Sequence, residues 1–148
     1  MMIEMENQLQ INMLGGFSLQ YNGKVIDYQS SRSHKLWLIL EYLITFRDKE
    51  ITQNELIELL WGDEFTENPA NTLKTLLHRL RTMLDELEFV PGKEMIIYNR
   101  GIYAWNPKLN YVVDTDQFLS LCALGDEAED VEQKITYYLS ALDYYKGD

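Results

Sequence analysis

Apolar and polar residues alternate at the start of the chain. The period of two from Leu9 to Met13 and from Phe17 to Tyr21 predicts two antiparallel strands. Asn22-Gly23 follows the second run and is a strong signal for a tight hairpin, so a third strand is expected over Lys24–Tyr28. The chain is therefore predicted to begin with a small antiparallel sheet.

Three helical patterns follow this sheet. The first begins after Ser33, a residue type that caps helices, and ends before the charged run that starts at Arg47. The second begins at Thr52, which forms a capping-box pattern with Glu55. The third begins at Asn68, and a proline occupies its first helical position. One apolar stripe runs along this third helix: Leu73, Leu77, Leu80 and Leu84.

A β-hairpin is expected after the third helix. Met95–Tyr98 and Ile102–Trp105, separated by Asn99-Arg100-Gly101, have the pattern of two short strands. Strands, three helices and a hairpin form the order of a winged helix-turn-helix, in which the third helix lies in a DNA major groove and the second braces it. The predicted fold class is α+β, with an N-terminal antiparallel sheet and a C-terminal wing hairpin.

The end of the chain predicts a pair of helices. The first is capped by Asp114 or Thr115, the second begins at Val131, and Gly125–Asp130 forms the turn between them. Because one helix pair cannot bury its apolar face alone, we expect a truncated start of a TPR-like repeat array. The predicted domains are a winged helix over residues 8–110 and a helical hairpin over residues 111–148.

Composition excludes several classes of protein. With Cys122 as its single cysteine, the chain can form neither an intramolecular disulfide nor a Cys-rich zinc site. The longest apolar stretch, Leu36–Phe46, is shorter than the roughly 20 residues that span a bilayer. We expect a soluble cytoplasmic protein without a membrane partner. Since nucleophile motifs and phosphate-binding glycine loops are absent from the sequence, we expect no enzyme and no cofactor. Two histidines far apart and one cysteine do not make a metal site, so we expect no metal.

The distribution of charge along the chain changes what the net charge implies about a nucleic-acid partner. A net charge of −11 argues at first against a nucleic-acid partner, because an acidic surface repels phosphates. However, neither Asn68–Leu84 nor Met95–Val113 contains an Asp or Glu, whereas residues 111–148 hold nine acids against two lysines. The predicted third helix and wing are therefore locally basic on an otherwise acidic chain.

The third helix supplies the candidate residues for DNA contact. If its leucine stripe faces inward, five polar residues project outward and Arg79 lies at the flank; the five are Asn71, Lys74, Thr75, His78 and Arg81. Arg79 and Asn71 are candidates for reading bases, since Arg pairs with guanine and Asn with adenine in bidentate fashion. Lys74, Arg81 and Arg100 are candidates for phosphates. The full predicted DNA-binding set is Asn71, Lys74, Thr75, His78, Arg79, Arg81 and Arg100.

Several motifs resemble one family. Leu60-Trp61-Gly62-Asp63, His78-Arg79-Leu80-Arg81 and Arg100-Gly101-Ile102-Tyr103 are similar to the OmpR-type winged helix of SARP-like bacterial transcription regulators. Asp114-Thr115-Asp116-Gln117-Phe118 resembles the start of the bacterial transcriptional activator domain. The resemblance implies direct-repeat promoter DNA and RNA polymerase as partners, and leaves a homodimer on the DNA open. The implied polymerase-contact loop consists of Asp63, Glu64, Phe65, Thr66 and Glu67.

Two functions stay open at this stage. The first is a sequence-specific regulator that binds double-stranded DNA, with its third helix in the major groove and its wing near the minor groove. The alternative is a winged-helix protein–protein interaction module without DNA binding, which uses the acidic surface and the helical hairpin. Salt separates the two, because duplex binding weakens steeply as salt rises.

Overall fold

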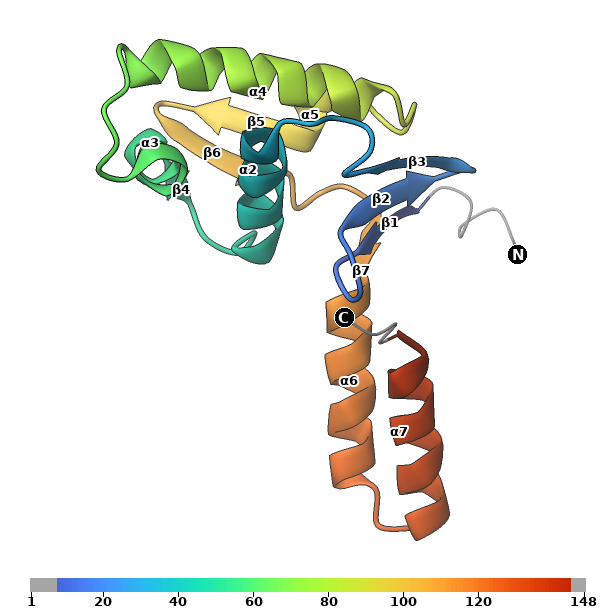
Figure 1. Cartoon of the computed structure of the whole chain (residues 1–148). Coiled ribbons are helices and arrows are strands. Elements are labelled where there is room, and N and C mark those ends of the chain that lie inside the picture. Colours follow the sequence, from blue (N-terminus) through green and yellow to red (C-terminus); the bar gives the residue numbers. More distant parts are fainter. Residues whose placement is uncertain (1–7, 145–148) are drawn as a thin grey trace. The chain divides into compact units, whose positions relative to one another are not determined.

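The structure, a computed structural model, describes residues 8–144 and divides into two compact units (Figure 1). The first unit comprises the chain up to Val25 and the chain from Asn110 onward, and the second comprises Ile26–Leu109. In chain order the elements are β1 (Leu9–Asn12), β2 (Ser18–Tyr21), β3 (Lys24–Asp27), α2 (His34–Thr45), β4 (Ile51–Thr52), α3 (Gln53–Trp61), α4 (Pro69–Asp85), α5 (Gly92–Met95), β5 (Ile96–Asn99), β6 (Ile102–Trp105), β7 (Tyr111–Val113), α6 (Asp114–Glu127) and α7 (Val131–Tyr144).

The first unit contains β1, β2, β7 and the first half of β3, which belong to a four-stranded sheet with the order β3-β2-β1-β7. β1 is antiparallel to β2, with Ile11 opposite Leu19, and parallel to β7, with Ile11 opposite Val113. All three side chains are buried. The predicted antiparallel strands are confirmed, whereas β7 was not predicted, because its three residues carry no alternating pattern of their own. The domain boundary predicted after residue 110 stays a prediction.

Asp114 does not cap α6, and the predicted cap is wrong for Thr115 as well. The N-cap is Val113, and it makes no side-chain cap hydrogen bond. The buried Asp114 carboxylate instead accepts hydrogen bonds from the backbone N–H groups of Met13, at 2.8 Å, and Leu14, at 3.0 Å. The carboxylate therefore ties the start of the helical hairpin to the segment that follows β1.

The helical hairpin formed by α6 and α7 is confirmed, but α6 is longer than predicted. Gly125 lies inside the helix, where an added Cβ would overlap the Tyr138 ring. The Tyr138 hydroxyl donates to Asp126 Oδ1 at 2.6 Å, and Lys134 Nζ donates to the Gly125 carbonyl at 3.2 Å. The turn accordingly begins at Ala128, and the missing Cβ of Gly125 leaves room for the Tyr138 ring of α7.

The second unit combines α2, α3 and α4 with a three-stranded sheet of order β4-β6-β5 (Figure 1). The predicted helix starts are confirmed: Ser33 accepts from the Leu36 N–H, and Thr52 and Glu55 form the capping box. β4 was not predicted, and it adds a third strand to the wing through antiparallel pairing with β6. Within the described part of the chain, no helix is long and apolar enough to cross a membrane.

Candidate nucleic-acid interface

α4 is fixed in the second unit by one face and by its start. Asn68 precedes it in the left-handed region, at φ 53°, and its side chain accepts from the Asn71 N–H at 3.3 Å. Asn tolerates this conformation better than most residues and also caps helices. The buried face of α4 consists of Leu73, Leu76, Leu77, Leu80, Met83 and Leu84. Anchored in this way, α4 leaves its other face in solvent.

The exposed face of α4 carries most of the predicted DNA-binding set. Five of its residues are solvent-exposed, and the Thr75 hydroxyl donates to the Asn71 carbonyl at 3.2 Å. Because α4 contains no carboxylate before Asp85, this face presents cations and neutral hydrogen-bonding groups only. The five residues, whose contact with DNA stays a prediction, are Asn71, Lys74, Thr75, His78 and Arg79.

Arg81 departs from its predicted position. Instead of projecting freely, its half-buried guanidinium donates from Nε at 3.2 Å and from Nη2 at 2.8 Å to the carbonyl of Ile96, the first residue of β5. Burial and the neighbouring Tyr98 raise the pKa of Tyr103 in the same sheet, while the Arg81 charge acts to lower it. The prediction that Arg81 faces outward is wrong, because a strand distant in sequence supplies an acceptor on that flank.

The wing places Arg100 at its tip. Asn99 pairs with Ile102, so the loop contains two residues, and both have positive φ: 51° for Arg100 and 82° for Gly101. Positive φ at both loop residues is typical of type I′ hairpin turns, whose twist matches that of the flanking strands. Arg100 is exposed, and the Gly101 carbonyl accepts from the Gln53 N–H at 2.9 Å. The start of α3 therefore holds the wing tip.

The loop between α3 and α4 combines acids with an exposed aromatic ring. Phe65 is 93% exposed, and Asp63, Glu64 and Glu67 are exposed beside it, whereas Thr66 is half-buried. A ring this exposed contributes almost nothing to the core of the second unit. Contact between this loop and RNA polymerase stays a prediction.

The structure brings additional residues beside α4 that were not assigned from the sequence. A hollow of about 430 Å³ has Ser30 and Ser31 in its lining together with His78 and Arg79 of α4. Glu86 is also part of this lining, so the hollow is not purely basic. The sequence carries one signal for it: the stretch between Asp27 and Glu41 contains no acid and includes two further cations, Arg32 and Lys35.

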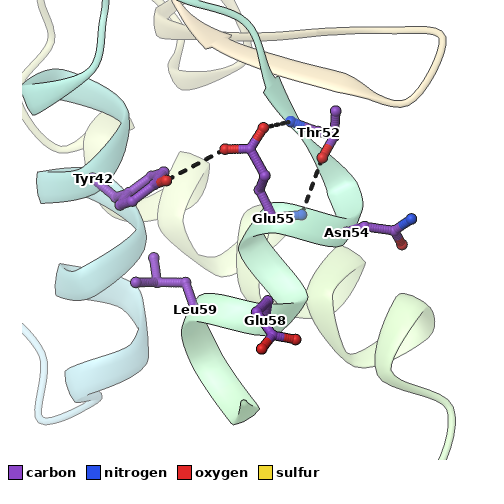
Figure 2. Close-up of a pocket in the computed structure, with 6 residues that line it drawn as sticks. All are labelled: Tyr42, Thr52, Asn54, Glu55, Glu58 and Leu59. Carbon is purple, nitrogen blue, oxygen red and sulfur yellow. Dashed lines mark hydrogen bonds between the residues drawn. The ribbon is translucent and has the colours of Figure 1, made fainter.

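A second hollow, of about 490 Å³, lies beside the start of α3 (Figure 2). Both oxygens of Glu55 are occupied there: Oε1 accepts from the Thr52 N–H at 3.5 Å, and Oε2 accepts from the Tyr42 hydroxyl at 3.3 Å. Lys49 Nζ lies 3.8 Å from the same Oε2 atom. The carboxylate thus serves the fold of α3. Within residues 8–144, no group of three His, Cys, Asp or Glu side chains could hold a metal ion.

Comparison with known proteins adds three findings. The family model described as "Transcriptional regulatory protein, C terminal" matches residues 29–102. The response regulator SaeR of Staphylococcus epidermidis, from two strains, is 36% identical over 63 residues, which cover 43% of this chain and 27% of SaeR. A solved structure of Mycobacterium tuberculosis EmbR in complex with a low affinity phosphopeptide matches with a TM-score of 0.77 and 18% identity, over 95% of this chain and 36% of that one. At that identity the likeness shows a shared fold, and the chain spans well under half the length of either relative.

Proposed function

The chain belongs to the family described as "Transcriptional regulatory protein, C terminal", and from this premise we propose that it binds double-stranded DNA with sequence specificity. The observation that carries the proposal is the exposed face of α4 from Asn71 to Arg79, which holds no acid and lies opposite the buried stripe. A helix of 17 residues is about 25 Å long at 1.5 Å per residue, which suits insertion into a major groove. Family membership implies a regulatory role rather than an enzymatic one.

Each exposed residue has a proposed role that follows from its chemistry. Arg79 and Asn71 read base edges, because their side chains can pair in bidentate fashion with guanine and adenine. Lys74 contacts phosphate as a point charge, and Thr75 and His78 contribute hydrogen bonds at the groove wall. In this arrangement the wing lies near the minor groove.

Arg100 is the proposed wing contact with the DNA backbone. It is exposed at the tip of a two-residue turn, and the segment from Met95 to Val113 contains no acid that would repel phosphate. Arginine inserted at or near a minor groove gains from the negative potential there.

Selection of bound sequences from a random duplex library, followed by fluorescence anisotropy on the selected site, tests the proposal. The Arg79→Ala variant should lose about 1 to 3 kcal/mol of discrimination for the selected site over a site with the contacted base exchanged. Lys49→Ala is the matched control, because it removes one positive charge from the exposed connection between α2 and β4. Equal discrimination in Arg79→Ala and the wild type would refute the base-reading role.

The rival function predicts a different result in the same assay. An interaction module shows no duplex binding at any salt concentration, whereas a DNA-binding domain loses affinity linearly in a plot of log K against log salt. The first outcome in the wild type would overturn the proposed function as a whole.

We further propose that the loop of residues 63–67 contacts RNA polymerase. The supporting observation is Phe65, an aromatic ring 93% exposed and flanked by acids, since such rings commonly anchor protein interfaces.

The resemblance also supports direct-repeat promoter sites, cytoplasmic action and two copies of the protein on the DNA. Titration of duplexes with one or two copies of the selected site measures that stoichiometry.

A further inference from the structure

Arg81 joins α4 to the first strand of the wing. Its Nε and Nη2 atoms both donate to the Ile96 carbonyl, at 3.2 and 2.8 Å. Hydrogen bonds from a charged donor are stronger than neutral ones, and the planar guanidinium gives this pair a defined direction. Ile96 is buried, so the accepting carbonyl belongs to the packed base of β5 and not to its free tip.

Two further contacts lie close to this link between α4 and β5, and we call the three contacts together the joint. The Gly92 N–H donates to Asp85 Oδ1 at 2.6 Å, which connects the last residue of α4 to the first residue of α5. Gly92 also packs so closely on α4 that an added Cβ would overlap the Arg81 carbonyl. Arg81, Asp85 and Gly92 therefore join α4, α5 and β5 at neighbouring points.

The joint attaches the first residue of β5 to α4, close to the wing turn. β5 runs only four residues, from Ile96 to Asn99, before the turn that carries Arg100. At the other end, the Gly101 carbonyl accepts from the Gln53 N–H. The wing is thus held at its base by α4 and at its tip by the start of α3.

We propose that Arg81 is a positioning residue that sets the wing against α4, so that Arg100 reaches the DNA at a fixed distance from the base-reading face. Arg81 is not a phosphate ligand in this account. The inference rests on the proposed function, because the wing has a target only if the chain binds a duplex. The sequence analysis predicts a DNA phosphate as the partner of Arg81, whereas the proposal assigns it the Ile96 carbonyl.

A double-mutant cycle of Arg81→Met and Arg100→Ala tests this assignment on the selected duplex. If Arg81 acts through the wing, each single variant should bind about tenfold more weakly, and the double variant no more weakly than Arg100→Ala alone. The slope of log K against log salt should fall by about 0.9 on losing Arg100, and by nothing more when Arg81 is also replaced.

Three outcomes would overturn the inference. The first is an additive loss of affinity, with a further fall in the salt slope for the double variant, because that result identifies a second phosphate ligand. The second is unchanged affinity in Arg81→Met. The third is unchanged affinity in Arg100→Ala, because the wing then makes no contact that Arg81 could position. Failure of the wild type to bind any duplex would instead refute the proposed function.

Asp85→Ala keeps the inference testable even if Arg81→Met folds poorly. This variant removes an exposed negative charge, so electrostatics alone predicts equal or tighter binding to DNA. Loss of the Gly92 hydrogen bond loosens the joint, so the positioning role predicts weaker binding, by about threefold for one modest contact. Circular dichroism of each variant confirms that its helices are intact, and equal or tighter binding of Asp85→Ala would contradict the proposal.

Discussion

α4 and α7 both carry apolar stripes of helical period, but the stripes differ in what covers them. In α4 the stripe is buried within the second unit. Of the side chains described in α7, only Ala141 is buried, whereas four large aliphatic ones are exposed: Val131, Ile135, Leu139 and Leu142. The spacing of apolar residues therefore predicts a helix and its inward face, but not whether other residues of the chain cover that face.

The same two regions differ in charge. α4 has no acid before Asp85, and its exposed face carries Lys74 and Arg79. The segment from α6 through α7 contains eight acids against one lysine, Lys134. An acidic body with one basic face disfavours non-specific DNA binding and leaves affinity to depend on the contacts of that face.

The largest expected effect comes from removing side-chain volume from the two stripes. Leu80→Ala, in the fully buried stripe of α4, should lower the free energy of unfolding by about 2 to 5 kcal/mol. Leu139→Ala is the matched change in α7, where the side chain is 58% exposed, and it should cost no more than about 0.5 kcal/mol. Urea unfolding followed by far-ultraviolet circular dichroism measures both, and equal losses would abolish the comparison.

A smaller effect is expected at the start of α4. Asn68→Ala removes the cap and places a residue with a Cβ but no capping group in the left-handed region, so it should lower the free energy of unfolding by about 1 to 2 kcal/mol. Asn68→Gly adopts that conformation without strain, so it should lower the free energy of unfolding by only about a few tenths of a kcal/mol. The same unfolding assay compares them, and a larger loss for the glycine variant would contradict the account of this helix start.

The smallest effect on folding and DNA affinity is expected for Phe65→Ala. The ring is almost fully exposed, so its loss should change the free energy of unfolding by less than about 0.5 kcal/mol and leave duplex affinity unchanged. Transcription from a promoter carrying the selected site should nevertheless fall, because the proposed polymerase contact is lost. Normal transcription by this variant would argue against a role for Phe65, and Leu139→Ala serves as the control for removal of an exposed apolar side chain.

The sequence alone was sufficient wherever local chemistry decides. The capping box of Thr52 and Glu55, the cap at Asn68 and the apolar period of α4 were all predicted and are present. The predicted winged-helix regulator family is confirmed by the family match over residues 29–102, and the predicted fold by the similar solved structure. The reason is that a cap or a capping box involves only residues a few positions apart. Their side chains can therefore form the same hydrogen bonds with the local backbone in any protein.

The tertiary structure alone decided the partners of Arg81 and Asp114. Arg81 donates to a carbonyl 15 residues away, and Asp114 accepts from N–H groups 100 and 101 residues away. Every residue has a backbone carbonyl, and all but proline have an N–H, so such partners leave no residue-type signature in the sequence. The sequence therefore determined which helix presents a basic face, while the fold decided that Arg81, a member of the predicted set, donates to the Ile96 carbonyl.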